Sequence, residues 1–195
     1  MIELPDRARA TPEGRAWLER LPRLVEECAD EWGLTLGEPF PLAAASLALA
    51  VTTRDADGAV LKICFPHRES EHEADALRAW DGIGAVRLFA HDRERWALLI
   101  ERCLPGTQLA DRPPHEGLDV LISLLPRLWV SATEPFRPLA DEAAWWASYL
   151  PERWRLAGRP FERSLLDAAC AALRDLPPTQ GSRCSCTRTS IPAMC

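Results

Sequence analysis

The residues of this chain best suited to chemistry are a lysine in an apolar segment and a glutamate in the segment that follows. Lys62 stands in the middle of residues 59–65, whose apolar character predicts a strand. Glu73 lies in residues 69–80, which predict a helix with an apolar face. An ammonium on such a strand, fixed by a carboxylate on the next helix, can hold the phosphates of a nucleotide. The spacing therefore predicts phosphoryl-transfer chemistry.

Alternatives remain open for this pair. Glu69 lies one helical turn before Glu73 on the same predicted face, and it is a second candidate partner for Lys62. Short matches of this type are common. The same residues also fit a lysine on a solvent-facing strand beside a helix with an ordinary acidic face. The distance between Lys62 and Glu73 decides between these interpretations.

Lysine usage favours a specific role for Lys62. The chain has 23 basic residues, and Lys62 is the only lysine among them. Arginine serves a solvated surface as well as lysine does, but it carries a planar fork rather than a compact ammonium. The one position that keeps lysine therefore indicates a need for the compact charge.

The pattern around the pair predicts a sheet with one inserted helix. Thr11 and Pro12 predict the start of a helix over residues 12–32, as an N-cap followed by proline at the first helical position. A turn is expected at residues 55–58. Apolar and alternating segments predict five strands, at residues 34–40, 46–54, 59–65, 84–92 and 96–103.

After Pro105 and Gly106 the pattern changes to helices alone. Three helical segments are separated by joints that contain proline and glycine, at residues 115–132, 141–158 and 161–176. Strands followed by helices predict an α+β fold in two segregated parts. We expect a first domain over residues 1–103, a partial helical domain over 104–180, and a tail without periodicity over 181–195.

Composition restricts the partners and the compartment. The 195 residues are 47% hydrophobic and 27% charged, which is ordinary for a globular protein. The net charge of −6 argues against nucleic acid or an anionic membrane as the main partner. No apolar run is long enough to span a bilayer, and the first residues have no apolar signal core. We therefore expect a cytoplasmic protein.

The seven cysteines do not follow the spacing of a disulfide framework or of a common zinc site. Four lie in periodic segments and are predicted to be free buried thiols: Cys28, Cys64, Cys103 and Cys170. Three lie in the tail, with no histidine near them: Cys184, Cys186 and Cys195. We expect no metal site built on cysteine.

The segment from about Trp32 to Leu109 carries a dense series of short motifs. In chain order they are Val60-Leu61-Lys62-Ile63, Glu73-Ala74-Asp75-Ala76-Leu77, Trp80-Asp81-Gly82, Gly84-Ala85-Val86-Arg87-Leu88, Ala97-Leu98-Leu99-Ile100-Glu101-Arg102 and Pro105-Gly106. Together they resemble the N-terminal lobe of the aminoglycoside/hydroxyurea antibiotic-resistance kinase family. The resemblance becomes diffuse over the later helices.

This resemblance implies a protein-kinase-like fold that binds ATP between two lobes. The N-terminal lobe would be a five-stranded antiparallel sheet with one inserted helix, and the helical C-terminal lobe would be incomplete. Lys62 would contact the α- and β-phosphates, with Glu73 fixing it. The backbone from Glu101 to Cys103 would be the hinge that binds adenine, and the Cys103 side chain would serve packing alone.

One departure from the kinase pattern lies between the first two predicted strands. The loop at residues 41–46 reads Pro-Leu-Ala-Ala-Ala-Ser and has no glycine, where kinases favour glycine so that backbone can approach phosphate. The Ser46 hydroxyl could donate to a phosphate. It fits a plain turn hydroxyl at least as well.

The catalytic loop implied by the resemblance is missing. The family carries a His-x-Asp-Leu-His-x-x-Asn stretch after the helices, and these 195 residues contain none. We therefore assign no catalytic residue, expect the Mg²⁺ site to be incomplete, and expect negligible kinase activity. With plausible codons, the tail from Gly181 shifted by one base reads Glu-Pro-Val-Leu-Leu-His-Gln-Asp-Leu-His-Pro-Gly-Asn-Val. We hypothesise a single-base deletion near Gly181, which resequencing would test.

Three functions remain open at this point. The first is an ATP-dependent phosphotransferase acting on an alcohol group of a small molecule such as an aminoglycoside, inactive in this form. The second is a non-catalytic nucleotide-binding or regulatory fragment. The third is an unrelated α+β interaction domain, which requires that Lys62 and Glu73 do not face each other. The sequence does not choose the acceptor among streptomycin, hydroxyurea and other alcohols.

Overall fold

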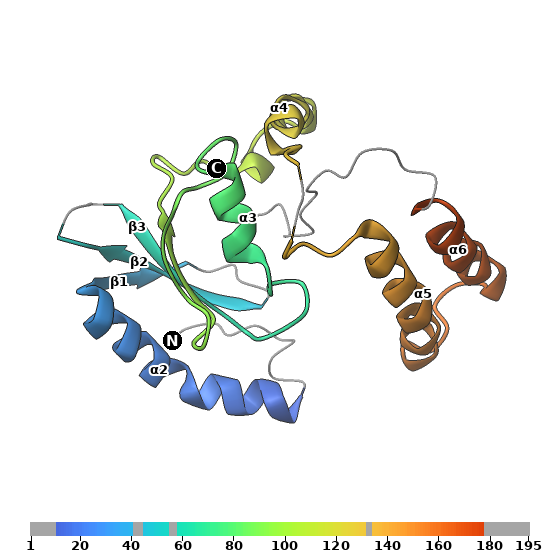
Figure 1. The fold of residues 1–195 in the computed structure, drawn as a ribbon, viewed down its shortest axis with the longest axis horizontal. Coiled ribbons are helices and arrows are strands. Elements are labelled where there is room, and N and C mark those ends of the chain that lie inside the picture. Colours follow the sequence, from blue (N-terminus) through green and yellow to red (C-terminus); the bar gives the residue numbers. More distant parts are fainter. Residues whose placement is uncertain (1–10, 41–44, 55–57, 132–133, 178–195) are drawn as a thin grey trace. The chain divides into compact units, whose positions relative to one another are not determined.

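The computed structural model describes residues 11–40, 45–54, 58–131 and 134–177, and Figure 1 shows its elements. The chain folds into an antiparallel sheet with helices before, within and after it. The elements are α2 (Pro12–Trp32), β1 (Thr35–Pro39), β2 (Ser46–Thr52), β3 (Ala59–Cys64), α3 (Glu73–Trp80), β4 (Leu88–Asp92), β5 (Ala97–Glu101), the short 3-10 helix η1 (Leu109–Asp111), α4 (Pro114–Leu128), α5 (Leu139–Leu156) and α6 (Arg163–Asp175).

The sheet has five strands in the order β1-β2-β3-β5-β4, and each neighbouring pair is antiparallel. The α3 helix is the one helix inserted between its strands. These findings confirm the predicted α+β class and the five-stranded antiparallel sheet with one inserted helix. The central position of β3 places Lys62 in the middle of the sheet.

The β2 sequence alternates large and small side chains, and this alternation separates the two faces of the sheet. Leu47, Leu49 and Val51 are buried, whereas the small residues between them are half-buried. Because side chains alternate across a strand, the large residues point to one face and the small ones to the other. The large residues join a core with the apolar side of α2. Lys62 lies on the opposite face, since Ala48 stands directly across from it.

The α2 helix covers the face opposite Lys62. The Thr11 side chain accepts a hydrogen bond from the Gly14 N–H at 3.1 Å, and proline occupies the first turn. Gly33 ends the helix in the left-handed region at φ 62°, which glycine adopts without steric cost. The predicted bounds of 12 and 32 are confirmed. The buried side of α2 packs into the sheet core through Trp17, Leu21, Leu24, Val25 and Cys28.

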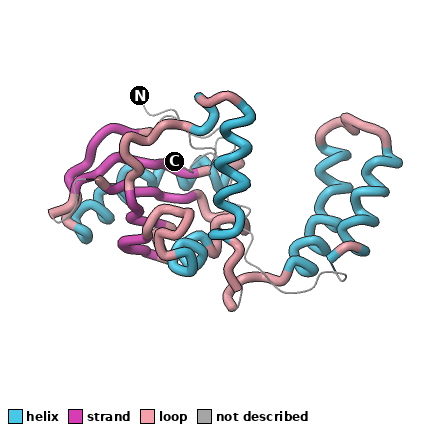
Figure 2. Tube along the Cα trace, turned by 90° about the horizontal axis from the view of Figure 1, so that it is seen from above, coloured by secondary structure: helices cyan, strands magenta, loops and turns pink. Residues whose placement is uncertain are grey.

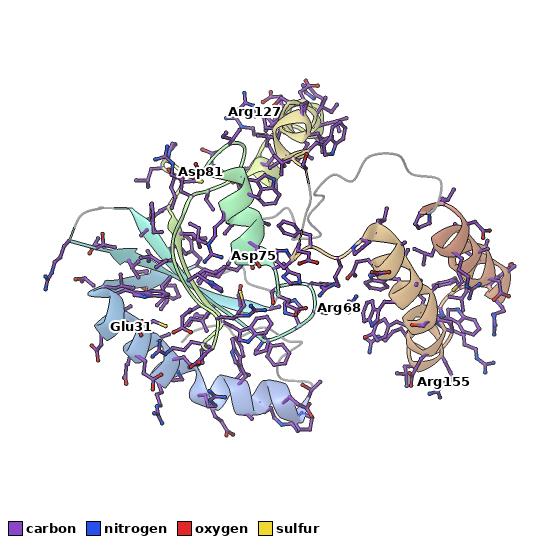
Figure 3. All side chains as sticks on the ribbon, viewed as in Figure 1. Glu31, Arg68, Asp75, Asp81, Arg127 and Arg155 are labelled. Carbon is purple, nitrogen blue, oxygen red and sulfur yellow. The ribbon has the colours of Figure 1, made fainter. Side chains whose placement is uncertain are left out.

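An arginine in the turn before β5 joins the sheet to α2. The Arg95 guanidinium donates to Glu27 at 3.2 Å and to Glu31 at 2.6 Å. Both carboxylates lie on α2, where Figure 3 labels Glu31. It also contacts Asp92, which accepts the backbone N–H groups of Glu94 and Arg95 at 2.8 and 2.9 Å. One cation therefore connects three carboxylates on two elements and holds α2 in register with the β4–β5 hairpin.

Two elements begin four residues later than predicted. The strand predicted at residues 84–92 begins only at Leu88, because Gly82 and Gly84 have positive φ angles of 78° and 83° that extended backbone does not accommodate. The helix predicted at 69–80 begins only at Glu73. The Ser70 hydroxyl bonds the His67 ring at 2.8 Å and stabilises a turn there instead.

Among the described residues, those up to Val130 form one compact unit and those from 131 to 177 form a second. The α4 helix belongs to the first unit; it begins one residue before the predicted 115 and ends at Leu128, four residues before the predicted 132. The α5 and α6 helices form the second unit, and Figure 2 shows them as two antiparallel helices. They pack through Ala143, Ala147, Leu166 and Cys170, and the Cys170 thiol lies 3.7 Å from the Ala147 carbonyl.

Several predictions concern residues outside the described ranges or go beyond what the fold tests. The turn at 55–58, most of the loop at 41–46 and the tail at 181–195 lie largely or wholly outside those ranges. The division into domains at residues 103 and 180 stays a prediction. Among the described residues, none of the helices combines the length and the apolar character that a bilayer span requires.

Candidate nucleotide-binding site

The site is built on the face of the sheet that α2 does not cover. Lys62 stands opposite Ala48 of β2 and Leu98 of β5. Leu61 and Ile63, its neighbours in the strand, are fully buried in the core on the other face. This alternation holds Lys62 rigidly on β3 and directs its side chain toward the face where α3 lies.

The Lys62 ammonium and the Glu73 carboxylate are in direct contact. Lys62 Nζ donates to Glu73 Oε1, and the two side chains are only 18% and 10% exposed. Glu73 is the first residue of α3, so the helix start fixes the position of its carboxylate. A pair this well covered is held more firmly than a surface salt bridge, whose net contribution is roughly 0–1 kcal/mol.

The surroundings of Lys62 keep it protonated. Burial lowers the pKa of Lys62 and is the largest single influence on it. The charges of Glu73 and Cys64 and the hydrogen bond to Glu73 together exceed this effect, so the pKa of Lys62 is raised above its ordinary value. A permanent cation therefore lies on this face of the sheet, which is what the phosphates of a nucleotide require.

A buried thiol adjoins the same carboxylate. Cys64 Sγ donates to the second oxygen of Glu73 at 3.6 Å. Burial raises the pKa of the Cys64 thiol to about 12, although the Lys62 charge acts in the opposite direction. Both oxygens of Glu73 thus have a partner on β3. The sequence analysis missed this contact, and the two-residue spacing of Lys62 and Cys64 on one strand face was the signal for it.

Glu73, and not Glu69, is the partner of Lys62. Because α3 starts four residues later than predicted, Glu69 lies in the preceding turn, 41% exposed, with its carboxylate 4.0 Å from His67. The predicted equivalence of Glu69 and Glu73 on one helix face is therefore wrong. The interpretation as an unrelated α+β interaction domain required that Lys62 and Glu73 do not face each other. Their direct contact does not meet that requirement.

Ser46 lies on the same face as Lys62, at the start of β2. It stands opposite Cys64, two pairs along the strands from Ala48 and Lys62. Ser46, Ala48 and Ala50 are all half-buried. Their small side chains cover less of the sheet surface beside the ammonium than large residues would. The alternation of large and small residues in β2 was a signal for this surface that the sequence analysis did not use.

The segment predicted as a hinge begins at Glu101, the last residue of β5, and ends at Cys103. The Glu101 N–H donates to the Arg87 carbonyl, and the Arg102 N–H donates to the Gly58 carbonyl, both at 2.9 Å. The Glu101 carboxylate accepts the Arg87 N–H at 3.0 Å. These groups hold β3, β4 and β5 together, so the side chain of Glu101 has a structural role. Adenine binding by the backbone of residues 101–103 stays a prediction.

The cysteines follow the prediction in three positions and depart from it in one. Cys28, Cys64 and Cys170 are free and buried, as predicted. Cys103 is half-buried and disulfide-bonded, so the prediction of a free packing thiol is wrong for it. The prediction assumed that Cys103 is buried in the last strand. Because β5 ends at Glu101, Cys103 lies beyond the strand and the sheet does not enclose its side chain.

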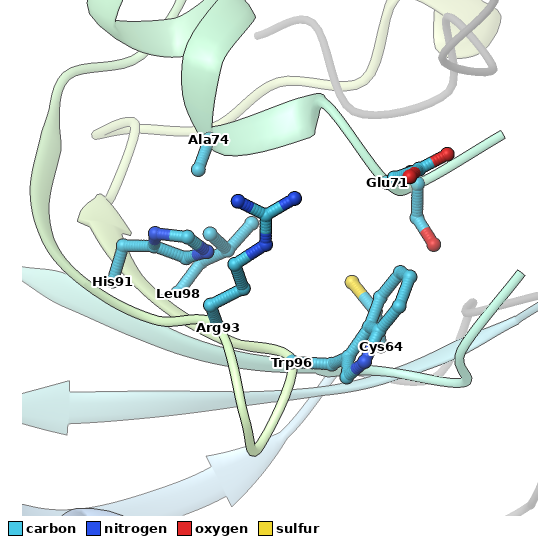
Figure 4. Close-up of a pocket in the computed structure, with 8 residues that line it drawn as sticks. Cys64, Glu71, Ala74, His91, Arg93, Trp96 and Leu98 are labelled. Carbon is cyan, nitrogen blue, oxygen red and sulfur yellow. The ribbon is translucent and has the colours of Figure 1, made fainter. Parts of the chain in front are cut away.

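A pocket of about 250 Å³ opens on the other side of the Cys64 thiol. Figure 4 shows Arg93 reaching between Ala74 on α3 and Trp96, with the Cys64 sulfur facing the space. Lys62 and Glu73 do not line it. The pocket therefore adjoins the ion pair on the same face of the sheet without including it. Its lining is Cys64, Ser70, Glu71, Ala74, His91, Arg93, Trp96 and Leu98.

The described residues offer a cation for phosphates but no complete metal site. Within residues 11–40, 45–54, 58–131 and 134–177, no group of three or more histidine, cysteine, aspartate or glutamate side chains could hold a metal ion.

Residues 32–179 match the family described as aminoglycoside/hydroxyurea antibiotic resistance kinase. The chain therefore belongs to this family of small-molecule phosphotransferases, and the resemblance seen in the sequence is confirmed. A protein-kinase-like fold is implied by this membership. No solved structure gives a significant match.

Individual relatives include two kinds of enzyme. The chain is 34% identical over 191 residues to a streptomycin 6-kinase of Streptomyces glaucescens, covering 94% of this chain and 62% of that relative. It is 37% identical over 174 residues to a hydroxyurea phosphotransferase of Kitasatospora aureofaciens, covering 87% and 51%. A streptomycin 6-kinase of Streptomyces griseus is 35% identical over 173 residues, covering 88% and 56%. The chain thus spans about half to three fifths of their lengths.

Proposed function

We propose that this chain is the nucleotide-binding part of an ATP-dependent phosphotransferase that transfers the γ-phosphate to an alcohol group of a small molecule. The contact between Lys62 and Glu73 carries the proposal. It supplies a fixed cation on the sheet face that α2 does not cover, next to the small side chains of Ala48 and Ala50. A nucleotide would place its phosphates at Lys62 and its base over this surface, toward residues 101–103.

Family membership supports the reaction and the acceptor class. Relatives named streptomycin 6-kinase and hydroxyurea phosphotransferase are 34% and 37% identical to this chain. We propose an aminoglycoside such as streptomycin as the acceptor, with hydroxyurea as the second candidate. The acceptor site and the metal-holding acids would lie outside the described residues.

The Glu73 carboxylate acts on the nucleotide through Lys62. It keeps the ammonium protonated and in place, whereas Lys62 alone would touch the phosphates. The residues described here supply no group identified as a base for the acceptor hydroxyl. We therefore propose that the chain by itself binds ATP and transfers phosphate negligibly. A non-catalytic nucleotide-binding role is compatible with the same geometry.

The test is ATP binding by isothermal titration calorimetry on the full chain. A hydrogen bond to a charged group contributes about 1.5–3 kcal/mol, so Lys62→Met should weaken ATP binding roughly ten- to a hundredfold. Glu73→Gln should weaken it less, because the ammonium remains. The matched control is Glu69→Gln, whose exposed carboxylate does not contact Lys62 and which should bind like the parent chain.

Two results would overturn the proposal. One is the absence of ATP binding by a chain that circular dichroism shows to be folded. The other is equal ATP affinity in Lys62→Met and in the parent chain. Incubation with γ-labelled ATP and streptomycin gives the second readout, and substantial labelling of streptomycin by the chain alone would contradict the expected lack of transfer.

A further inference from the structure

The pocket beside the ion pair has the features of a separate ligand site. Leu98 pairs with Lys62 on one side and with His91 on the other, so His91 stands in the same row of the sheet as the ammonium, two strands away. Leu98 and His91 both line the pocket. Its volume of about 250 Å³ is just below the roughly 300–1,000 Å³ of pockets that hold drug-sized ligands, so it suits a molecule of about one or two rings.

Arg93 gives the pocket a positive charge. It lies in the turn between β4 and β5, and Figure 4 shows its guanidinium extended into the space toward Ala74. Among the residues that the structure describes, none accepts a hydrogen bond from this guanidinium or forms an ion pair with it. The neighbouring Arg95, by contrast, is paired with three carboxylates. Arg93 is thus available to an anion, and a carboxylate can bind it through two parallel hydrogen bonds.

His91 supplies a second donor. Its Nδ1 lies 3.2 Å from the Arg78 guanidinium, and because arginine only donates, Nδ1 is the acceptor of this hydrogen bond. Burial, and then the charge of Arg78, lowers the pKa of His91, so the ring is neutral at pH 7 with its proton on Nε2. Within the described part of the chain, this Nε2–H has no acceptor. It can therefore donate to a ligand that Arg93 binds.

Trp96 forms an apolar wall of the pocket in an unfavourable backbone conformation. Its φ angle is 54°, in the left-handed region that bulky residues rarely adopt. Hairpin turns usually place glycine in that region, because glycine adopts it without steric cost. Residues held in such conformations gather at functional sites, and here the conformation brings an indole to the pocket. A planar aromatic ligand would pack on this indole.

We propose that this pocket binds a small aromatic carboxylate. The Arg93 guanidinium and the His91 Nε2–H would hold its carboxylate, and the Trp96 indole would cover its ring. Glu71 also lines the pocket, and its negative charge would repel the ligand's carboxylate. Figure 4 shows Arg93 between His91 and Glu71, and the Glu71 carboxylate lies 3.9 Å from His72 Nε2. We therefore expect the carboxylate of the ligand on the His91 side of Arg93.

A ligand in this pocket would act on Glu73 through the pocket walls. Glu71 and Ala74 line the pocket and stand on either side of Glu73 in the chain. Cys64 lines it too, and its thiol donates to Glu73. A ligand that touches both α3 and the β4–β5 hairpin binds only while the two face each other, and in that arrangement Glu73 contacts Lys62. The ligand and ATP should therefore strengthen each other's binding by the same factor, about fivefold. This coupling rests on the proposed function, whereas the pocket itself does not.

The test is calorimetric titration of the full chain with 2-naphthoate, and with 2-naphthamide as its uncharged counterpart. 2-Naphthoate should bind at one site with a dissociation constant of about 1 mM or lower, and 2-naphthamide at least about tenfold more weakly. Arg93→Gln should weaken 2-naphthoate binding roughly tenfold or more, because it removes the charged donor. The matched control is Arg20→Gln, which alters an exposed arginine of α2 outside the pocket and should bind like the parent chain.

Two further measurements test the same pocket. The nitrogen-15 resonance of His91 Nε2, identified by its loss in His91→Phe, should shift when 2-naphthoate is added. Trp96→Gly removes the indole and keeps a residue suited to the turn, so it should abolish 2-naphthoate binding in a chain that circular dichroism shows to be folded. The proposal is overturned by the absence of saturable 2-naphthoate binding, by equal binding of 2-naphthamide, or by unchanged affinity in Arg93→Gln.

The ligand pocket and the proposed function fail in different ways. Binding of 2-naphthoate that depends on Arg93, by a chain that does not bind ATP, supports the pocket and overturns the proposed function. ATP binding without 2-naphthoate binding supports the proposed function and overturns the pocket. Titration of ATP into the chain saturated with 2-naphthoate tests the coupling, and unchanged ATP affinity, or displacement of one ligand by the other, overturns it.

Discussion

The sheet with its α2 helix and the helices α4 to α6 differ in how fully they bury their apolar residues. In the sheet, Leu61 and Ile63 are fully buried and Cys28 on α2 joins the same core. In α5 and α6, buried contacts are confined to one line of residues, and Leu139, Leu156 and Leu165 are 51%, 60% and 60% exposed. Among the described residues, the apolar side chains of the first region are therefore enclosed more fully than those of the helical regions.

The difference in burial follows from the contacts that stabilise each region. The sheet core lies between β2, β3, β5 and α2, all of which lie within about the first hundred residues. Helices depend on tertiary packing of an apolar face for most of their stability. Two packed helices cover only the faces they turn toward each other, so α5 and α6 retain exposed leucines. Each prediction below tests whether this contrast holds.

The largest expected effect compares one leucine in each region. Leu61→Ala opens a cavity in the centre of the sheet core and should lower the free energy of unfolding by about 2–5 kcal/mol. Leu118→Ala removes an exposed side chain and should change it by less than about 0.5 kcal/mol. Urea denaturation followed by circular dichroism measures both. Equal losses in the two variants would show that Leu118 on α4 is as enclosed as Leu61 in the core.

The second effect concerns the ion pair within the closed region. Lys62→Met leaves the Glu73 carboxylate without its cation, although the Cys64 thiol remains beside it. The free energy of unfolding should fall by about 1–3 kcal/mol, a range that allows for the partial exposure of the pair. A double variant, Lys62→Met/Glu73→Met, should recover part of that loss because no unpaired charge remains. Glu69→Gln is the matched control and should unfold like the parent chain. A double variant less stable than Lys62→Met would contradict the pairing.

The third effect concerns the connection between α2 and the β4–β5 hairpin. Arg95→Ala removes the cation shared by Glu27, Glu31 and Asp92, so the three carboxylates should repel and the urea midpoint should fall, by less than for Leu61→Ala. The loss should shrink in 1 M salt, because salt screens exposed charges. Arg23→Ala, which removes a single exposed contact to Glu27, is the control. A loss independent of salt would indicate packing instead.

The smallest effect is a pH dependence confined to alkaline solution. The folded pKa of Cys64 is raised by burial to about 12 from an ordinary value of 9.0. Above pH 9 the unfolded chain loses this proton and the folded chain keeps it, so stability falls as pH rises from 9 toward 12. Cys64→Ala should flatten the change in urea midpoint between pH 8 and pH 10. An unchanged slope would assign it to other groups.

Much of the fold followed from local chemistry. Thr11, Pro12 and Gly33 are residues with strong local preferences, and they correctly bounded α2. The beginnings of α3 and β4 were placed wrongly because distant or turn-specific effects decide them. Ser70 stabilises a turn before α3 through its hydroxyl, and Gly84 lies against α4 at a positive φ. Apolar periodicity reports neither of these interactions.

The sequence predicted the Lys62–Glu73 pair but not the residues that surround it in the site. Residue type and order identified Lys62 and Glu73, because an ammonium on a strand and a carboxylate on the following helix have few ways to meet. The thiol contact from Cys64 and the half-buried Ala48 depend on strand register, which pairing across the sheet sets. The bond of Cys103 could not be foreseen from spacing, since sequence alone does not give disulfide connectivity.

The uniqueness of Lys62 makes this protein a natural single-label system. Apart from the terminal amine, it carries the one aliphatic amine in 195 residues. Its protonation beside Glu73 slows acylation, so an amine-directed reagent reports how often the ammonium leaves its carboxylate. Mass spectrometry of a single peptide would therefore follow the occupancy of the site in a crude mixture, with no engineered handle and no background from other lysines.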